Sequence, residues 1–429
     1  MAARCPTFVG QILGAALALL FVMKIAVITN LYWPDEIGGY EILCRQVCED
    51  LVKQGHQVVV LTSKTDAHGP EALSGARIER TLALTEPFDR PATRRSRRSL
   101  IAHSRNVRKT ATFLRREQPD VVFFWSMRRL TLGPVVATQR MGVPHLFTLN
   151  DAWPLTFAPR PFKWEARALA SCILDRSIWR DRTTLALEPC EAVAISENLR
   201  TSLAGVSPFD DPTVLYQGVP VDRFAVERRP ATDSTLRLLY VGQLHEYKGP
   251  HVAVEAIGEL KRRRPDVRVR LTIAGQGDEA YERRLRARAA ELGIEARWSG
   301  RVPFAQMPSV YAEHDVLLFT SLWAEPFGLT HIEAMASGLS VVATPTGGTA
   351  ELLGDGGSAL SVPPGDVSAL AHAIETLHDD RGMCERLAEA GRELVRERYS
   401  LSRYVSNLEG LLRNICRHEA AEVMGESTR

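Results

Sequence analysis

The sequence predicts an α/β fold made of two doubly wound domains, each with a mostly parallel sheet. Short runs of β-branched and aromatic residues alternate with amphipathic helical stretches, which is typical of a sheet covered by helices on both faces. The alternation occurs twice and is interrupted near residues 217–230, so we expect one domain on each side of that segment. A chain of 429 residues also has the length of two domains of about 200 residues each.

Apolar runs of strand length occur in both halves of the chain. In the first half, the runs that we interpret as buried parallel strands are KIAVIT, QVVVLT, DVVFFW, PHLFTL and EAVAIS. In the second half they are LRLLYVG, VRLTIAG, DVLLFT and SVVAT. Helical patterns lie between these runs, for example YEILCRQVCEDLVKQG, which should end at Gly55, and PHVAVEAIGELKRRR.

The domain boundaries follow from this pattern. Both domains should be Rossmann-like, with helices on the two faces of a doubly wound sheet. We expect an N-terminal domain over 23–220, a C-terminal domain over 221–399, a helix over 400–418 and a frayed tail over 419–429.

Residues 1–22 form an apolar leader. Its run FVGQILGAALALLFV is 15 residues long, which is short of the roughly 20 residues that span a bilayer as a helix. No small-residue cleavage site precedes the first strand, which argues against a secretory signal. Met23 is an alternative start, and the leader would then not belong to the native protein. Otherwise the leader is a membrane-associating segment.

The composition is that of a globular protein, with 45% hydrophobic and 24% charged residues. The seven cysteines show no paired spacing, so they do not form a disulfide framework. This favours a reducing compartment, and we expect a cytoplasmic protein.

The net charge of +2 conceals a strongly basic stretch. Residues 90–140 contain 13 Lys and Arg residues and 2 Asp and Glu residues. The stretch could be a solvated helix face, or it could bind anionic lipid at about 1 kcal/mol per basic residue near the membrane. The lipid alternative would place the protein at the inner face of the membrane. No nucleic-acid-binding motif accompanies the charge, so we expect no nucleic-acid partner.

Polar and glycine-rich segments follow several of the predicted strands. In open α/β sheets, ligands bind beyond the carboxyl ends of the strands, so these segments are candidates for one site in a cleft between the two domains. In the first domain they are YWPDEIGGYE and NDAWP, and in the second they are VGQLHEYKG, AGQGDEAY and EPFGLTHIE.

Two of these segments combine glycine with a helix start. Gly38 and Gly39 would let the backbone approach a ligand closely at the N-terminus of a helix, where anions are favoured, although a tight turn explains them equally well. Lys248 is followed by Gly249 and Pro250, which should begin the next helix. An ammonium about 4 Å from a phosphate is worth on the order of 4 kcal/mol at an effective dielectric constant of 20.

The segment AGQGDEA, which contains Gly275, is similar to the dinucleotide-binding fingerprint. A true fingerprint follows the first strand of its domain and has an acidic residue at the end of the next strand. Here the segment follows the second strand of its domain, and the next strand, EARWSG, ends without an acid. We therefore expect no nicotinamide cofactor. The sequence also lacks HExxH and any D-x-D pair that would hold a metal-bound nucleotide.

The stretch WAEPFGLTHIEAMASG contains two glutamates, Glu325 and Glu333. The residues from Thr330 to Glu333 have the spacing of a capping box, in which Thr330 would accept from the Glu333 amide and Glu333 would reach back. Gly338 should end the helix. Glu325 lies outside this helix and has no capping role.

A second interpretation of this stretch is chemical. The amides of the residues that precede and begin the helix lack intrahelical acceptors, so they could donate to hydroxyl groups or phosphate oxygens. Glu325 could stabilise positive charge on a reacting carbon, and Glu333 could accept from a ribose while still capping the helix. The amides in question are those of Phe327, Gly328 and Leu329.

The stretch resembles the E-x7-E signature of retaining glycosyltransferase family 4, whose members have the GT-B fold and use nucleotide sugars. Glu325 and Glu333 stand at its two glutamate positions. The resemblance extends over about residues 24–416. Its other segments are IGGYE, LVKQGHQVVVLT, FTLNDAWPL, AISENLR, VLYQGVPVDRF, VGQLHEYKG, PTGGTAELL and PPGDVSALAHAI.

The resemblance implies a division of roles between the domains. The second domain would bind the nucleotide sugar, the first would bind the acceptor, and the last helix would cross back onto the first domain. Glu325 would face the transferred sugar, Glu333 would hold the ribose and Lys248 the diphosphate. Gly38 and Gly39 would close on the phosphates from the other side. The family retains the anomeric configuration and requires no divalent metal and no cofactor.

The resemblance also suggests roles for further residues. The amides of Phe327, Gly328 and Leu329 would bind hydroxyls of the sugar, while the base would lie against the backbone of 275–278, including Gly275, and of 300–302. Two positions depart from the family pattern. Gln243 stands where the family often has an arginine, which removes one charge-assisted contact to the leaving group. Asn150-Asp151 stands where histidine-aspartate is common, and asparagine cannot carry a proton near neutral pH.

The function expected from the sequence is transfer of a hexose from a nucleoside diphosphate sugar to a hydroxyl of a glycan or lipid-linked acceptor, with retention and without metal, in polysaccharide biosynthesis. One alternative is a nucleotide-sugar epimerase or phosphorylase of GT-B type. The other is a non-catalytic partner that binds sugar nucleotides, which Gln243 and Asn150 would suit.

Overall fold

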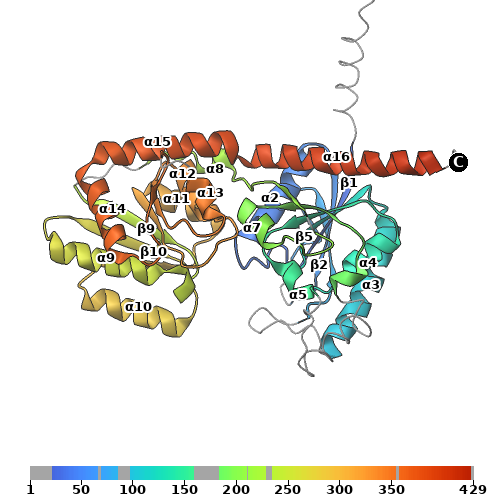
Figure 1. The fold of residues 1–429 in the computed structure, drawn as a ribbon, viewed down its shortest axis with the longest axis horizontal. Helices are drawn as coiled ribbons and strands as arrows, with labels where there is room; N and C mark the ends of the chain where they lie inside the picture. The colour runs from blue at the N-terminus through green and yellow to red at the C-terminus, as the bar shows by residue number, and fades with distance from the viewer. Residues whose placement is uncertain are drawn as a thin grey trace, which may run out of the picture. The chain divides into compact units, whose positions relative to one another are not determined.

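The computed structural model divides into two compact units, and its ribbon is drawn in Figure 1. One unit contains the described residues of Met1–Thr148, Trp153–Glu191 and Glu409–Arg429, and the other contains those of Leu149–Ala152 and Ala192–Leu408. The residues that the structure describes are 22–65, 69–85, 97–158, 183–209, 211–228, 234–353 and 357–426.

Two features predicted from the sequence lie wholly or partly outside these ranges. The leader at 1–22 is outside them except for Val22, and so are residues 90–96 of the basic stretch. Among the described residues, no helix combines the length and the apolar composition that crossing a membrane requires.

The first sheet has eight strands in the order β3-β4-β2-β1-β5-β6-β7-β8. β1 is parallel to both of its neighbours, β2 and β5, whereas β3 is antiparallel to β4. The residues of β1 after the first are buried, as expected for a central strand covered on both faces. The strands are β1 (Lys24–Thr29), β2 (Gln57–Ser63), β3 (Ala72–Leu73), β4 (Ala76–Leu82), β5 (Val121–Ser126), β6 (His145–Leu149), β7 (Glu191–Ala194) and β8 (Thr213–Val214).

The helices of this half follow the strands as the alternation predicts. The first of them, α2 (Gly39–Lys53), places Leu43, Val47 and Leu51 on one buried face at a spacing of four residues. Gly55, at φ +95°, follows its end as predicted. The other elements are α3 (Arg97–Glu117), α4 (Gly133–Arg140), α5 (Trp153–Phe157), the 3₁₀ helix η2 (Thr184–Ala186), α7 (Glu197–Ser202) and α8 (Val221–Phe224).

The second sheet has six parallel strands in the order β11-β10-β9-β12-β13-β14. The strand order reverses between β9 and β12, and in doubly wound sheets ligands bind at such a reversal. The loops that follow β9 and β12 therefore begin side by side. The strands are β9 (Leu236–Val241), β10 (Val269–Ala274), β11 (Ala296–Gly300), β12 (Val316–Phe319), β13 (Ser340–Ala343) and β14 (Leu360–Ser361).

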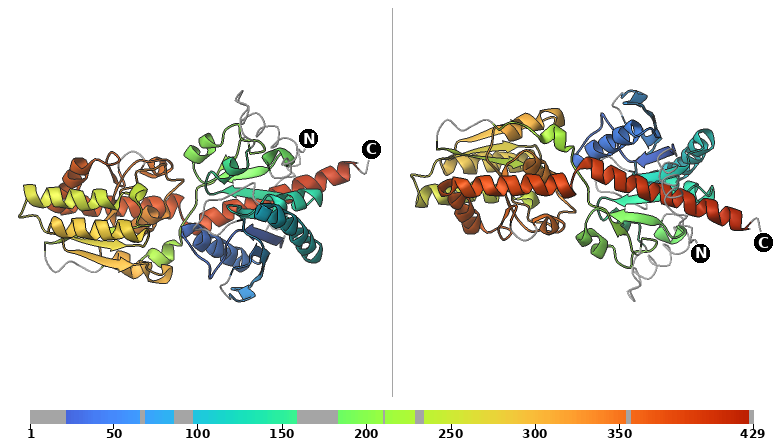
Figure 2. Two further views of the ribbon diagram at one scale, coloured as in Figure 1. Left: turned by 90° about the horizontal axis from the view of Figure 1, so that it is seen from below. Right: turned by 90° about the horizontal axis from the view of Figure 1, so that it is seen from above.

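Helices cover both faces of the second sheet. In Figure 1, α9 (Pro250–Arg263) and α10 (Glu279–Glu291) lie on one side of it, and α12 (Leu329–Ala336) and α15 (Arg381–Arg398) lie on the other. The views from below and from above show the same layering (Figure 2). The remaining elements are η3 (Glu246–Lys248), η4 (Phe304–Gln306), α11 (Met307–Ala312), α13 (Thr349–Leu353) and α14 (Val367–Asp379).

The last helix, α16 (Leu401–Glu426), is longer than predicted. The frayed tail expected from 419 onward was wrong for 419–426, where the strong helix formers Ala, Glu and Met continue the helix. From Glu409 onward the helix belongs to the first unit. There the Glu409 carboxylate lies 2.9 Å from the buried His56 ring, and the Cys416 thiol lies 3.6 Å from the Asp120 carbonyl oxygen.

The predicted fold class is confirmed, and each predicted strand is present. The strands that the sequence did not reveal are the short β3, β8 and β14 and the longer β4. The sequence of β4 is ARIERTL, in which charged residues interrupt the apolar ones, and several of its residues are only partly buried. It therefore lacks the continuous apolar pattern of the central strands.

Candidate active site

The loops after β9 and β12 are joined at their bases by a close backbone contact. Gly249 begins α9 in the left-handed conformation, at φ +68°, as its N-cap residue. Its carbonyl accepts from the Thr320 hydroxyl at 2.8 Å, and a Cβ at this position would lie 1.9 Å from the Thr320 carbonyl oxygen. Only glycine fits here, and the contact fixes Lys248 beside the end of β12.

Lys248 and Glu325 form an ion pair. The Lys248 ammonium lies 2.7 Å and 2.8 Å from the two carboxylate oxygens of Glu325, and the Ser321 hydroxyl donates to the same carboxylate at 2.6 Å. Glu325 is only 4% exposed. A buried carboxylate is costly unless it is paired and hydrogen-bonded, and here it is both. The two charged groups predicted from separate loops therefore meet in the structure.

The main chain at Glu325 is held by a pair of glycines, Gly347 and Gly348. The Gly348 amide donates to the Glu325 carbonyl at 2.7 Å. A Cβ at Gly347 would lie 2.4 Å from that carbonyl oxygen, and one at Gly348 would lie 2.2 Å from the carbonyl oxygen of Pro326. Sequence reasoning did not assign this role, although the Gly-Gly step in PTGGTAELL was its signal.

The N-terminus of α12 differs from the predicted capping box. Gly328 is the N-cap residue, at φ +97°, and no side chain caps the helix. Thr330 therefore lies one turn position inside the helix, where it cannot serve as an N-cap, and the capping box is wrong. The predicted stop is confirmed, because Gly338 follows the last helical residues at φ +76° and donates to the Met335 carbonyl at 2.9 Å.

Glu333 accepts a hydrogen bond from Tyr311 instead of capping the helix. The distance from the Tyr311 hydroxyl to the carboxylate is 2.9 Å, and both residues are buried. Burial raises the pKa of Glu333 to about 7, and the hydrogen bond from Tyr311 opposes part of this shift. A carboxylate with this pKa is poised to lose its proton when a ligand donates hydrogen bonds to it. Tyr311 was not among the residues predicted from the sequence.

The segment before α12 is rigidly packed. The Phe327 ring is fully buried, and its centroid lies 5.9 Å from that of Tyr216 and 6.0 Å from that of Tyr399. His331 packs beneath Gly328, where burial lowers the pKa of its imidazole to about 3 and keeps it neutral. The first amides of a helix lack intrahelical acceptors. Packing therefore fixes the direction in which those at 327–329 can donate.

The loop that contains Gly275 lies directly beside the loop after β9. At Gly275 a Cβ would lie 1.8 Å from the Gly242 carbonyl oxygen, and at Gly277 it would lie 2.2 Å from the Leu244 carbonyl oxygen. Asp278 caps α10 by accepting from the Tyr281 amide at 2.7 Å. Close backbone approach and helix capping thus account for the residues that are similar to a dinucleotide fingerprint.

Gln243 lies on the exposed side of the same loop, where its side-chain oxygen accepts from the Tyr247 hydroxyl at 3.3 Å. The Tyr240 hydroxyl donates to the backbone carbonyl of Gln243 at 3.2 Å. These contacts hold the loop and leave Gln243 uncharged, in agreement with the departure noted in the sequence.

The remaining predicted residues are at two other positions. Gly38 and Gly39 are in the first unit, at the start of α2, where the Gly38 amide donates to the Glu41 carboxylate at 2.9 Å. Asn150 and Asp151 directly follow β6. Asn150 is buried and accepts from the Gln217 side-chain amide at 2.6 Å.

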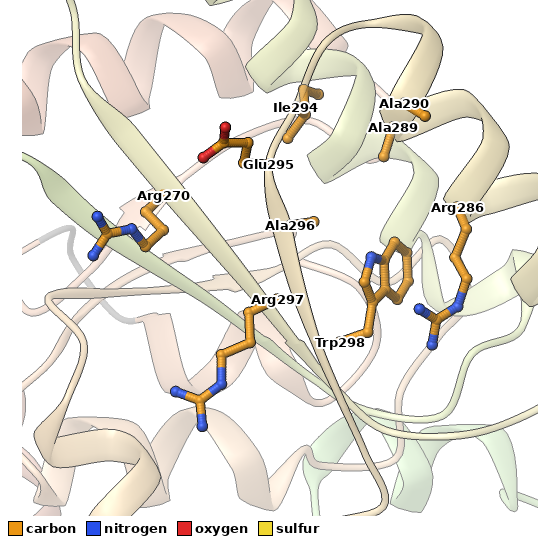
Figure 3. Close-up of a pocket in the computed structure, with 9 residues that line it drawn as sticks. All are labelled: Arg270, Arg286, Ala289, Ala290, Ile294, Glu295, Ala296, Arg297 and Trp298. Carbon is orange, nitrogen blue, oxygen red and sulfur yellow. The ribbon is translucent and has the colours of Figure 1, made fainter.

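Two further observations concern alternative sites. Within the described ranges, no group of three or more His, Cys, Asp and Glu side chains is arranged to hold a metal ion. A hollow of about 490 Å³ lies at the free edge of the second sheet, where Arg286 stacks over Trp298 at 4.4 Å (Figure 3). The hollow is lined by Arg270, Arg286, Ala289, Ala290, Ile294, Glu295, Ala296, Arg297 and Trp298, none of which was predicted to be functional.

The chain matches two family models that adjoin each other. Residues 37–223 match "Glycosyltransferase Family 4", and residues 224–394 match "Glycosyl transferases group 1". Together the two models cover residues 37–394 of the 429.

Relatives and solved structures agree with this match. A glycogen synthase of Mycobacterium tuberculosis is 28% identical over 386 residues, which is 86% of this chain and 90% of the relative. A glycosyltransferase from Rickettsia africae has a similar structure, with a TM-score of 0.70 at 18% identity over 92% of this chain and 98% of that one. The Anabaena protein HepE, solved with UDP-glucose, gives a TM-score of 0.67 at 18% identity over 91% and 100% of the two chains.

The two sheets, and the ion pair at the strand reversal of the second, define a GT-B protein of the nucleotide-sugar-dependent class. The chain belongs to the retaining glycosyltransferases of family 4, and it is a glycosyltransferase that uses a nucleotide sugar as donor.

Proposed function

We propose that the protein transfers a hexose from a nucleoside diphosphate sugar to a hydroxyl of a glycan or lipid-linked acceptor. The observation that carries this proposal is the ion pair between Lys248 and Glu325 at the strand reversal. It brings a cation suited to a diphosphate and a carboxylate suited to a cationic sugar carbon within one small volume. Both charges are present before any ligand binds, so little reorganisation is needed.

The ion pair would separate when the donor binds. The Lys248 ammonium would move to the diphosphate, where it is worth on the order of 4 kcal/mol at 4 Å and an effective dielectric constant of 20. As the bond between the anomeric carbon and the diphosphate breaks, negative charge develops on the diphosphate and positive charge on the sugar. Lys248 would stabilise the first, and the freed carboxylate of Glu325 would stabilise the second.

The other donor contacts would come from the segments around this pair. The amides of Phe327, Gly328 and Leu329 would donate to hydroxyls of the sugar, and the buried Phe327 ring would keep them oriented. Glu333 would accept from the ribose. Backbone groups of 275–278, including Gly275, and of 300–302 would lie against the base.

The first domain would complete the site. Gly38 and Gly39 would approach the phosphates through the N-terminus of α2, and Asn150 and Asp151 would face the acceptor. Because Gln243 carries no charge, the leaving group would depend more on Lys248 than it does where an arginine is present. The departures from the family pattern would then be variations within an active enzyme.

The donor is tested by thermal shift with UDP-, GDP- and ADP-sugars in the presence of EDTA. HepE was solved with UDP-glucose, so a UDP-sugar is the first candidate. A ligand at 100 times its dissociation constant should add about 2.7 kcal/mol of stability. Proton NMR of the product should show the same anomeric configuration as in the donor. Activity that requires added Mg²⁺ or Mn²⁺, or an inverted product, would contradict the proposal.

Two rival functions give different results in the same assays. An epimerase or phosphorylase of GT-B type would turn over the nucleotide sugar without an acceptor alcohol. A non-catalytic sugar-nucleotide-binding partner would be stabilised by the ligand but would release no nucleoside diphosphate. The proposed function requires both stabilisation and release that depends on the acceptor.

Glu333 makes stability depend on pH. Its pKa in the folded protein is about 7, against an ordinary value of 4.5, so between these pH values the folded state holds a proton that the unfolded state has lost. Wild-type stability should therefore fall as pH rises from about 5 to 8, by on the order of 3 kcal/mol from this group. Glu333→Gln cannot titrate and should lack this loss. Urea unfolding of both proteins at the two pH values measures the difference.

The same variant tests the ribose contact. Glu333→Gln should weaken binding of the nucleoside diphosphate by about 1.5–3 kcal/mol, the value of a hydrogen bond to a charged group. Wild-type binding near pH 7 should release protons, which calorimetry in buffers of different ionisation enthalpy detects. Parallel unfolding profiles together with unchanged nucleotide affinity would show that Glu333 is only a buried structural carboxyl.

A peripheral location at the inner face of the membrane is part of the proposal, and α3 supports it. The exposed side of this helix carries basic residues, and Ile101 between them is 71% exposed. Such a face is suited to anionic lipid. The exposed basic residues of α3 are Arg98, Arg105, Arg108, Lys109, Arg115 and Arg116.

Vesicle flotation tests this location. The full chain should float with vesicles that contain anionic lipid, and binding should weaken as salt is raised. Replacing Arg105, Arg108 and Lys109 with glutamine should reduce binding, because each basic residue near the surface contributes about 1 kcal/mol. Equal flotation with neutral vesicles, or none with either kind, would leave α3 as a solvated surface.

A further inference from the structure

Three aromatic side chains lie beside Lys248, namely His245 and Tyr247 on the loop after β9 and Trp323 on the loop after β12. We call them the aromatic platform. Tyr247 is 43% exposed and Trp323 is 42% exposed, although each is large and apolar. Single exposed apolar residues are common on protein surfaces. Exposed aromatic rings in mutual contact beside a buried ion pair are better explained by a ligand.

The platform is held in a defined geometry. The rings of His245 and Tyr247 are stacked, with centroids 5.3 Å apart and planes at 10°. Tyr247 meets Trp323 edge-on at 5.8 Å and 76°, and the Lys248 ammonium lies 5.2 Å from the Trp323 centroid. The Leu322 amide donates to the Tyr247 carbonyl at 2.9 Å, which joins the two loops. Rings fixed in this way lose little entropy when a ligand binds.

The position of the platform relative to the reacting groups indicates which substrate it would contact. Lys248 lies between the Glu325 carboxylate, at 2.7 Å, and the Trp323 ring, at 5.2 Å. If Lys248 holds the diphosphate, the platform lies on the leaving-group side of the sugar. A retaining transfer places the acceptor oxygen on the face of the anomeric carbon from which the diphosphate departs. The platform is therefore on the acceptor side and not under the donor sugar.

We propose that the aromatic platform binds a pyranose ring of the acceptor, so that the acceptor is a carbohydrate rather than a simple polyol or a lipid hydroxyl. This inference rests on the proposed function. The C–H groups on one face of a pyranose ring are apolar and pack against aromatic faces, while its hydroxyls remain hydrated. The stacked ring would bring a neighbouring hydroxyl of the acceptor to the anomeric carbon of the donor.

The reaction balances without a further reagent. The acceptor hydroxyl oxygen bonds to the anomeric carbon, and the bond from that carbon to the diphosphate breaks with its electron pair on the diphosphate. The hydroxyl proton ends on the departing diphosphate. The platform takes no part in these bond changes, so its residues position the acceptor and do not act on the reacting atoms.

The test uses saturation-transfer NMR and transfer kinetics on the full chain, with maltotriose, cellotriose and mannotriose as probes and glycerol as the ring-free control. At least one trisaccharide should receive saturation at its ring protons, and glycerol should not. Trp323→Ala should raise the KM for that trisaccharide about 10-fold, as expected for loss of one stacking contact. It should leave the KM for the nucleotide sugar unchanged.

Two variants control for loop geometry. Trp323→Phe keeps a ring and should restore most of the acceptor affinity. Leu322→Ala is a matched control, because Leu322 is the preceding residue, is also exposed and has no ring. It should change the KM for the acceptor less than 2-fold. Melting temperatures should stay close to wild type in all three variants.

The outcomes separate this inference from the function on which it rests. If no trisaccharide binds, or if Trp323→Ala and Leu322→Ala have equal effects, the inference is wrong while donor binding and retention still stand. If Trp323→Ala weakens the nucleotide sugar instead, the platform belongs to the donor site and the inference is also wrong. If no nucleotide sugar stabilises the wild type, the proposed function itself has failed.

Discussion

Glu325→Gln should lower the rate of sugar transfer by about 10³-fold or more, which is the upper range for loss of one preorganised electrostatic contact. Glutamine has nearly the same shape and can still accept from the Ser321 hydroxyl, which is 2.6 Å from the carboxylate. What it lacks is the negative charge that would stabilise the cationic sugar. Nucleoside diphosphate should still bind, because its contacts lie elsewhere. Transfer rate, nucleotide affinity and melting temperature of the variant measure the three effects.

The control for Glu325→Gln is the hydroxyl that supports it. Ser321→Ala removes the hydrogen bond to Glu325 but keeps the charge, so it should reduce the rate far less, by about 10-fold. Glu325→Gln should also cost some stability, because the ammonium of Lys248 loses its partner. If Glu325→Gln transfers sugar at the wild-type rate, Glu325 is a structural ion-pair partner and the mechanism is wrong.

Lys248→Met should reduce kcat/KM for the donor by about 10²–10³-fold, because it removes the only charge assigned to the leaving diphosphate. It should also destabilise the fold by about 2 kcal/mol, since the buried carboxylate of Glu325 is left without its counter-ion. Combining Lys248→Met with Glu325→Gln should recover much of the stability but none of the activity. Donor kinetics and urea unfolding of the single and double variants measure both effects.

A second lysine of the same domain is the matched control for Lys248. Lys261 is exposed and donates to the Gly293 carbonyl at the end of α10, so Lys261→Met should leave kcat/KM within 2-fold of the wild type. Lys248→Arg keeps the charge and should retain more activity than Lys248→Met. Equal activity of Lys248→Met and Lys261→Met would exclude Lys248 from the leaving-group site.

The fold was predictable where hydrophobic pattern and topology agree. Continuous apolar runs specify central strands that are covered on both faces, and glycines such as Gly249 and Gly338 indicate where helices begin and end. β4 was not predictable, because its charged residues break that pattern. The helical continuation of α16 past residue 418 was missed because polar composition was interpreted as fraying although its residues favour helix.

The site was predictable at the level of loops but not of partners. Lys248 and Glu325 were expected near one sheet edge because both follow strands, yet they are 77 residues apart, and only the strand reversal brings them into contact. The bond between Tyr311 and Glu333 joins residues 22 apart on two helices, and no sequence pattern indicates it. The capping box failed because Gly328 in the left-handed conformation took the N-cap position.

The most direct test of the account is the structure of this protein bound to a nucleoside diphosphate and the transferred sugar. In the ligand-free chain the Lys248 ammonium is 2.7 Å and 2.8 Å from the Glu325 carboxylate oxygens. In the complex, the account predicts that this ammonium contacts a diphosphate oxygen and that the freed carboxylate faces the anomeric carbon. A complex in which the nucleotide binds while the ion pair of Lys248 and Glu325 stays intact would contradict it.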